Sequence, residues 1–199
     1  MENSILVDLL RHGEAAGGAL YRGRQDDPLS PNGWQQMREA VTGGGPWQAI
    51  ISSDLRRCAD FALELSDQLS VPLYSEPHWR ELDFGRWEGR TAEDILAEDA
   101  EALGAFWRDP VSTHPPGGER LSVFAERVLS AWDRWLPEMS GGRWLLVVHG
   151  GVIRVLLAHV LGMSLSNLLR IEVPYACRST LLIPTAGEGM ESRLLSHGA

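Results

Sequence analysis

Two histidines in this 199-residue chain each follow an aliphatic run and precede a glycine. His12 ends the segment LLRHG, with Arg11 directly before it, and His149 stands in LLVVHGG. Aliphatic runs of this length predict buried strands, and glycine at the strand end lets backbone amides approach a ligand closely. Histidine can act as a nucleophile or a general base, and arginine binds phosphate or carboxylate through a planar fork. The pair therefore indicates a site for an anionic substrate.

Arg56 and Arg57 follow the predicted strand Ala49–Ser52, in the segment SSDLRRC. Ser53 or Asp54 can cap the helix that follows, which places both arginines in its first turn. Cations at a helix N-terminus oppose the macrodipole, so stability alone would not select them there. We expect one of the two to serve a functional site and the other to face solvent.

A carboxylate, Glu81, lies in the segment RELDFGRWEG, where Leu82, Phe84 and Trp87 are available to bury it. Partial burial of a carboxyl group favours its protonated form, which is the form that a general acid needs. Glu81 is therefore a candidate for acid–base catalysis.

Strand-like and helix-like segments alternate along the chain, which predicts a parallel sheet with helices on both faces. The predicted strands are Ile5–Leu10, Ala49–Ser52, Trp144–Val148, Leu169–Val173 and Ser179–Pro184. The predicted helices are Asn32–Val41, Leu55–Leu69, Thr91–Trp107, Ser122–Leu136 and Gly151–Leu161. The last two strands are expected to form an antiparallel hairpin at the sheet edge, with Pro174 near its turn. The predicted class is α/β, with a mostly parallel central sheet and an antiparallel edge strand.

In open parallel sheets, ligands bind beyond the carboxyl ends of the strands. His12 and His149 are therefore expected to face the same crevice. We expect residues 1–199 to form a single domain, with an acidic insertion at about residues 76–118 that covers this crevice.

The composition limits the partners of the protein. Its net charge of −9 argues against a general nucleic-acid binder. Its longest apolar runs are shorter than the roughly 20 residues that a membrane span needs. Cys58 and Cys177 form no CxxC pair, so reduced cysteines in a cytoplasmic protein are expected, with no metal cluster.

The segments LLRHGE, SSDLRRCADFA, RELDFGRWEG and VVHGG, in this order, resemble the histidine phosphatase superfamily, with its phosphoglycerate mutase-like fold. The resemblance extends from Leu6 to about Pro184. It implies that His12 is the nucleophile and becomes a phosphohistidine, that Glu81 is the acid–base residue, and that His149 is the second histidine of the pocket.

The same resemblance implies that Arg11 and Arg57 bind the phosphate, together with Gly23 and Gly150, and that neither a cofactor nor a metal is needed. In one respect the chain departs from the family pattern. Gly18 occupies a position, six residues after the catalytic histidine, where the family often has asparagine.

The segments EDAEALGAFWRDP and PPGGERLSVFAERV most resemble the α-ribazole phosphatase branch of the superfamily. This resemblance implies a phosphomonoester hydrolase that acts on α-ribazole 5′-phosphate in cobalamin biosynthesis. Trp87, Phe106 and Trp107 could stack on the benzimidazole ring, although packing in the core is at least as good an account of each.

A phosphate monoester is nearly a dianion, and Arg11, Arg57 and a protonated His149 would outnumber its charges at close range. A phosphoglycerate mutase or a broad-specificity sugar or nucleotide phosphatase would use the same residues. A phosphate sensor would need the arginines but not Glu81, and a metal hydrolase built on both histidines would lose activity with EDTA. The expected partner is a small-molecule phosphomonoester, and the edge hairpin could support a homodimer.

Overall fold

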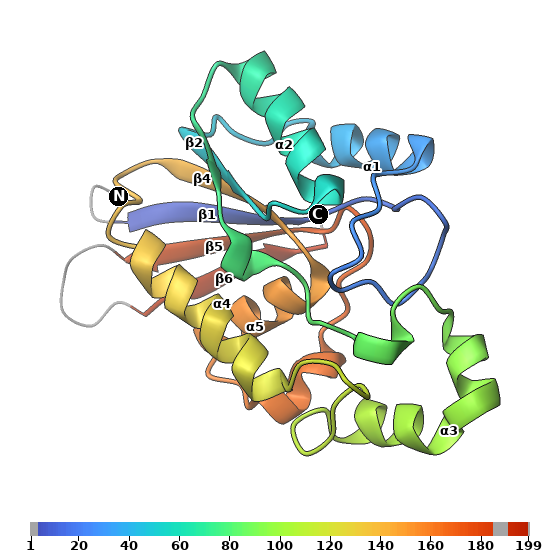
Figure 1. The fold of residues 1–199 in the computed structure, drawn as a ribbon. Coiled ribbons are helices and arrows are strands. Elements are labelled where there is room, and N and C mark those ends of the chain that lie inside the picture. Colours follow the sequence, from blue (N-terminus) through green and yellow to red (C-terminus); the bar gives the residue numbers. More distant parts are fainter. Residues whose placement is uncertain (1–3, 185–190, 199) are drawn as a thin grey trace.

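The computed structural model describes residues 4–184 and 191–198 (Figure 1). These residues form one six-stranded sheet in the order β3-β2-β4-β1-β5-β6. Its strands are β1 (Ser4–Arg11), β2 (Ala49–Ser52), β3 (Leu73–Ser75), β4 (Arg143–Val148), β5 (Arg178–Pro184) and β6 (Arg193–His197). β1, β2, β3 and β4 run parallel to one another, β5 is antiparallel to β1, and β6 is antiparallel to β5. The predicted fold class is confirmed.

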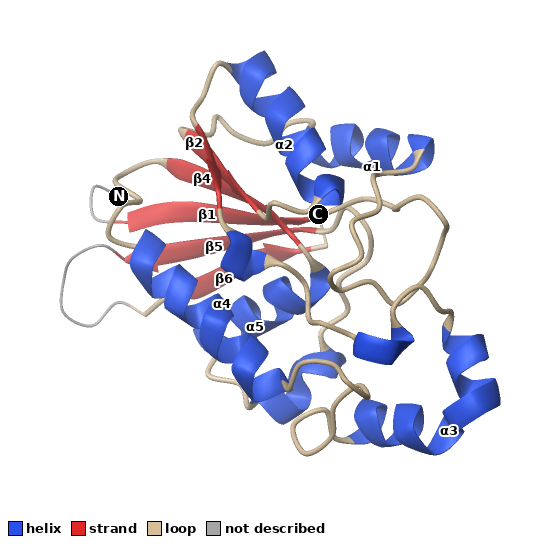
Figure 2. Ribbon diagram, viewed as in Figure 1, coloured by secondary structure: helices blue, strands red, loops and turns tan. Residues whose placement is uncertain are grey.

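Helices cover both faces of the sheet, as Figure 2 shows. The α-helices are α1 (Pro31–Val41), α2 (Arg56–Leu69), α3 (Ala92–Arg108), α4 (Leu121–Trp135) and α5 (Gly150–Val160). Three short 3₁₀-helices are η1 (Pro77–Trp79), η2 (Gly85–Trp87) and η3 (Leu165–Arg170). α1 and α2 lie on one face, and α4 and α5 lie on the other (Figure 1).

The side chains of β1 alternate between two hydrophobic clusters, one on each face of the sheet. Val7 and Leu9 belong to the cluster that contains Val152 of α5, whereas Leu10 belongs to the cluster that contains Phe61 of α2. Successive strand residues point to opposite faces, so a strand buried on both sides is apolar at nearly every position. This explains the aliphatic run before His12.

The predicted hairpin at the sheet edge is wrong in one of its strands. Leu169–Val173 is not extended: η3 ends at Arg170, and a loop continues from it. Leu168, directly before this segment, is buried, and α5 and η3 are in contact, so the chain here packs against a helix instead of forming a strand. The antiparallel edge is formed by β5 and β6, and the sequence analysis predicted neither β6 nor the short β3.

Residues 76–118 carry η1, η2 and α3, and α3 stands beyond the carboxyl ends of the parallel strands (Figure 1). α3 is interrupted at Asp99, whose φ of −149° and ψ of 67° are not helical. The assignment of residues 76–118 as an insertion within a single domain stays a prediction. Within the described residues, no helix has the length and apolarity needed to cross a membrane.

Candidate active site

His12 lies directly after β1, and its ring is buried at the carboxyl edge of the sheet. Its Nδ1 lies 2.7 Å from the carbonyl oxygen of Gly13. Because a carbonyl can only accept a hydrogen bond, Nδ1 carries the proton and Nε2 keeps a free lone pair. Burial lowers the pKa of His12 well below its ordinary value, and the charges of Arg57 and Arg11 lower it further. The ring is therefore neutral and can act as a nucleophile.

His149 precedes α5, and its ring centroid lies 5.2 Å from that of His12, in an edge-to-face arrangement. Arg57 Nε donates to His149 Nδ1 at 3.3 Å, so the other nitrogen, Nε2, carries the proton and donates to Ser53 Oγ at 2.8 Å. The sequence thus brings the two strand-end histidines together, as predicted.

The expectation of a protonated His149 is not met in this structure. Burial lowers the pKa of His149 well below its ordinary value, with further contributions from Arg57, His12 and Arg11. A protonated Nδ1 could not accept the hydrogen bond that Arg57 donates. The ring is therefore neutral here, and the positive charge of the site comes from arginines.

Arg57 is fully buried, and three of its nitrogens are engaged by the protein. Besides the bond to His149, Nη1 donates to the carbonyl of Gln25 at 2.6 Å and Nη2 to that of Gly23 at 2.9 Å. Arg56 is exposed, so the structure separates the two arginines as expected.

The predicted N-terminal cap of α2 by Ser53 or Asp54 is wrong, because the N-cap residue is Leu55. Asp26, in the loop that follows β1, accepts the N–H of Arg56 at 2.7 Å.

Arg11 is the last residue of β1, and it lies against Tyr175, with its guanidinium carbon 4.4 Å from the ring centroid. Nη1 donates to the carbonyl of Val173 at 2.5 Å. Its buried Nε has no hydrogen-bond partner among the described residues. A buried donor without a partner is costly in a folded protein, so this nitrogen is available for an anion.

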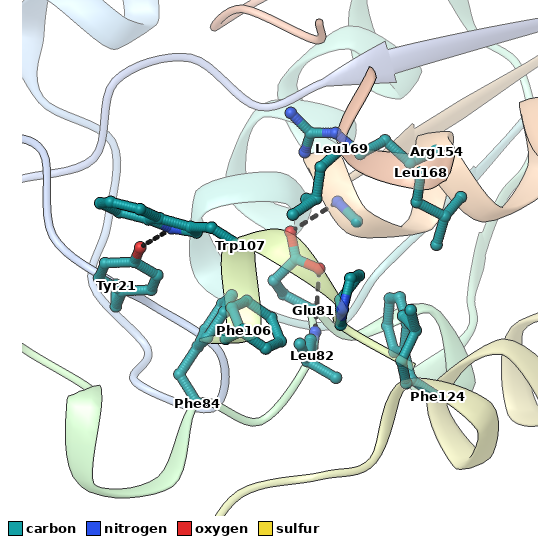
Figure 3. Close-up of a pocket in the computed structure, with 13 residues that line it drawn as sticks. Tyr21, Glu81, Leu82, Phe84, Phe106, Trp107, Phe124, Arg154, Leu168 and Leu169 are labelled. Atoms are coloured by element: carbon teal, nitrogen blue, oxygen red, sulfur yellow. Dashed lines mark hydrogen bonds between the residues drawn. The ribbon is translucent and has the colours of Figure 1, made fainter. Parts of the chain in front are cut away.

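Glu81 is held at the N-terminus of α5, as the dashed lines in Figure 3 show. Oε2 accepts the N–H of Gly151 at 2.9 Å, and Oε1 accepts that of Leu82, also at 2.9 Å. A Cβ on Gly151 would lie 2.1 Å from Oε1, so only glycine permits this approach. The carboxyl group is therefore fixed in place by backbone amides of two different segments.

Two cavities meet at Glu81. The first has a volume of about 310 Å³ and contains the predicted Arg11, His12 and Gly150. Its remaining wall comes from the loop Ala19–Arg22 and from Glu81, Phe84, Ala92, Arg154 and Tyr175. A neutral nucleophile, arginine donors and a carboxyl group around one cavity are the set of groups that phosphoryl transfer requires.

The second cavity has a volume of about 270 Å³, and aromatic side chains form much of its wall (Figure 3). These are Tyr21, Phe84, Phe106, Trp107 and Phe124. Trp107 Nε1 donates to the hydroxyl of Tyr21 at 3.0 Å, which links α3 to the loop after β1. Phe106 and Trp107 are thus well placed to contact a substrate, but Trp87 is buried behind Phe106 and is not part of the wall.

Sequence reasoning missed Arg154 and Tyr175, which both line the first cavity. Arg154 lies one helical turn after Gly150, a spacing that could have identified it. Tyr175 lies in an irregular loop, where no spacing in the sequence indicates that its side chain faces the cavity. Gly23, Arg57 and His149 are not part of the wall of either cavity, so their contact with phosphate stays a prediction. Within residues 4–184 and 191–198, no three histidine, cysteine or acidic side chains gather as metal ligands would.

Comparison with known proteins identifies the family of the chain. The family model of the histidine phosphatase superfamily (branch 1) matches residues 7–193. The adenosylcobalamin/alpha-ribazole phosphatase of Escherichia coli (strain K12) is 31% identical over 182 residues, which are 87% of each chain. The glucosyl-3-phosphoglycerate phosphatase of Mycolicibacterium vanbaalenii is 34% identical over 172 residues, 80% of this chain and 75% of that one.

A solved structure, the alpha-ribazole phosphatase from Shigella flexneri, superposes with a TM-score of 0.83 at 26% identity, covering 98% of this chain and 96% of that one. The family model matches most of the chain, and the solved structure has the same fold. The chain therefore belongs to branch 1 of the histidine phosphatase superfamily, and it is a phosphatase.

Proposed function

We propose that this phosphatase hydrolyses α-ribazole 5′-phosphate through a phosphohistidine on His12, as a step in cobalamin biosynthesis. The catalytic groups are His12, Glu81 and His149, and the phosphate ligands are Arg11 and Arg57 with the backbone at Gly23 and Gly150. The second cavity and the similarity to the relatives named above both support this substrate.

In the first step, His12 Nε2 attacks phosphorus and forms the N–P bond while the ester O–P bond breaks. Glu81 donates its proton to the leaving alcohol. In the second step, water attacks phosphorus, the N–P bond breaks, and Glu81 takes the proton from the water. Splitting one difficult displacement into two lowers the barrier of each, and arginine donors stabilise the charge on the equatorial oxygens.

The observation that carries the substrate assignment is the aromatic cavity on the far side of Glu81. Tyr21, Glu81 and Phe84 border both cavities, so an ester whose phosphate contacts His12 would extend its leaving group past Glu81. α-Ribazole carries a planar benzimidazole on its ribose. Aromatic rings favour such a group through burial and offset stacking.

The assignment is tested by phosphate release from α-ribazole 5′-phosphate, ribose 5-phosphate and p-nitrophenyl phosphate, with EDTA present throughout. We expect kcat/KM to be highest for α-ribazole 5′-phosphate and unaffected by EDTA. Equal values for α-ribazole 5′-phosphate and ribose 5-phosphate would refute the substrate and leave a broad-specificity phosphatase. Mutase activity on 3-phosphoglycerate would refute hydrolysis as the main reaction.

Trp107→Ala tests the role of the cavity itself. Trp107 is an exposed side chain on the cavity wall, and loss of its aromatic contact should raise KM for α-ribazole 5′-phosphate roughly 10-fold, with little change for ribose 5-phosphate. Leu96 is exposed on the same helix and is not part of either cavity, so Leu96→Ala is the matched control. A similar KM increase for both substrates would place Trp107 in general packing.

The same proposal includes a cytoplasmic location and catalysis without a cofactor or metal. Cys58 and Cys177 are free thiols in the structure, which fits a reducing compartment. Cys58 is buried, with its Sγ 3.7 Å from His149 Nε2, and burial raises its pKa, so it acts as packing for His149. A homodimer through the sheet edge stays a prediction.

A further inference from the structure

Arg154 stands where the two cavities meet, and it has no role in the mechanism above. It lies on α5, one turn after Gly150, and lines both cavities. Its Nε donates to the carbonyl of Ile171 at 2.8 Å. Within the described part of the chain, its two terminal Nη groups have no hydrogen-bond partner.

The position of Arg154 is coupled to that of Arg11. A Cβ on Gly150 would lie 3.1 Å from Arg154 Nη1 and 3.4 Å from Arg11 Nε, so both guanidinium groups flank the same glycine. The short segment from Ile171 to Val173 anchors both of them, through one carbonyl each. Two cations are therefore fixed side by side by one piece of backbone.

Arg22, a third arginine of the first cavity, differs from Arg154 in its hydrogen bonds. Its Nε donates to Asp27 at 2.6 Å, and its two Nη groups donate to the carbonyls of Gly18 and Ala16 at 2.5 Å each. Its nitrogens are thus all engaged in holding one loop. Arg154 uses only Nε in this way and keeps its terminal donors for another group.

The charge balance of the cavity favours an anion at this point. Burial is the largest effect on Arg11 and lowers its pKa; the charge of Glu81 raises that pKa, and the charge of Arg154 lowers it further. Like charges fixed next to each other destabilise the folded protein unless an anion lies between them. While His149 is neutral, the positive charge of the site comes from its arginines.

We propose that Arg154 binds the phosphoryl group directly and supplies the third positive charge of the site, beside Arg11 and Arg57. This inference rests on the proposed phosphatase chemistry, but not on the identity of the leaving group. The terminal donors of Arg154 bind the equatorial oxygens in both steps, and they bind free phosphate in the same way.

The test measures inhibition by orthovanadate and by inorganic phosphate, with p-nitrophenyl phosphate as the substrate. Charge-assisted hydrogen bonds of this kind are worth roughly 10- to 100-fold in affinity. Arg154→Met should weaken both inhibitors by that factor, and it should lower kcat/KM by a similar factor for every ester. Arg154→Lys should recover part of the loss. Arg170→Met, which removes an exposed arginine of η3, is the matched control.

Unchanged inhibition constants in Arg154→Met would overturn the proposal. A decrease in kcat/KM that is confined to α-ribazole 5′-phosphate and ribose 5-phosphate would also overturn the proposal, because Arg154 would then bind the sugar. Thermal unfolding shows whether the variant is folded: Arg154→Met should unfold cooperatively in buffer and lose the increase in Tm that phosphate gives the wild type. If Arg154→Met does not fold, Arg154→Lys decides by the same inhibition constants.

These outcomes are separate from those that concern the proposed function. A wild-type enzyme that prefers another ester refutes the α-ribazole assignment and leaves this test intact. A wild-type enzyme that binds neither phosphate nor vanadate refutes both proposals.

Discussion

The two buried histidines make the stability of this protein depend on pH in a defined way. His12 and His149 both have a pKa lowered well below the ordinary 6.5, chiefly by burial and then by Arg57. In the unfolded chain they would titrate near pH 6.5. Below that pH the unfolded state binds more protons than the folded state. Unfolding is therefore favoured as the pH falls from about 6.5 toward the pKa values of the folded protein.

The size of the effect follows from the two histidines alone. A histidine that stays neutral in the folded protein costs about 1.3 kcal/mol of stability between about pH 7 and about pH 5.5. Two such residues cost about 2.5 kcal/mol over the same interval, which is a large fraction of the net stability of a single domain. Carboxylates also titrate toward the acid end of this range, so a variant is needed to isolate the histidines.

The assay is urea denaturation of the wild type and of the double variant His12→Gln/His149→Gln at both pH values, in buffer without phosphate. The variant removes the two histidines and leaves every other titrating group in place. Its loss of unfolding free energy should be about 2.5 kcal/mol smaller than that of the wild type. Equal losses in the two proteins would show that the histidines are charged when folded, which would refute the neutral nucleophile. Added phosphate should reduce the wild-type loss, because a bound anion favours protonated histidines.

Three further outcomes test individual contacts. Glu81→Gln should lower kcat/KM roughly 100-fold for an alkyl phosphate and much less for p-nitrophenyl phosphate, whose leaving group needs no proton; parallel losses would contradict a role as general acid. Gly18 has a φ of 79° and open space at its Cβ; asparagine tolerates this conformation. Gly18→Asn should therefore fold and lower the KM for phosphate esters, whereas Gly18→Ala should leave the KM unlowered. A raised KM for Gly18→Asn would contradict a phosphate contact from this position. Asp26→Ala removes the acceptor at the start of α2 and should cost about 1 kcal/mol in urea denaturation; no change would show that water replaces the cap.

The parts of the fold that could be predicted from the sequence are those set by local periodicity. β1 and β4 are buried on both faces, so their aliphatic runs predict where the two strands lie. The glycines that follow predict where the strands end, at the same edge of the sheet. Local pattern failed for residues 169–173, because an apolar run of this length suits a strand or a packed turn equally well. The packing of η3 against the preceding helix α5 decides between them, and Leu168, directly before this segment, is buried.

The sequence likewise predicted only part of the candidate site. His12 and His149 could be predicted to lie together because the carboxyl ends of parallel strands share one edge of the sheet. The choice of Arg57 over Arg56 came from the family resemblance. The protonation state of His149 was not accessible, since it depends on which partner each ring nitrogen meets. Ser53 and Arg57 come from the neighbouring strand end and helix, and no pattern in the sequence specifies their geometry.

The neutrality of His149 changes how the charge of the site has to be understood. A histidine that accepts a hydrogen bond from Arg57 holds that arginine in place, but it adds no positive charge of its own. A protein that binds a dianion then needs another fixed cation, and that cation must lie where burial does not remove its charge. Arginine meets this requirement better than histidine, because its guanidinium stays protonated when partly buried. Arg154, held by a single carbonyl at the border of the two cavities, satisfies both conditions.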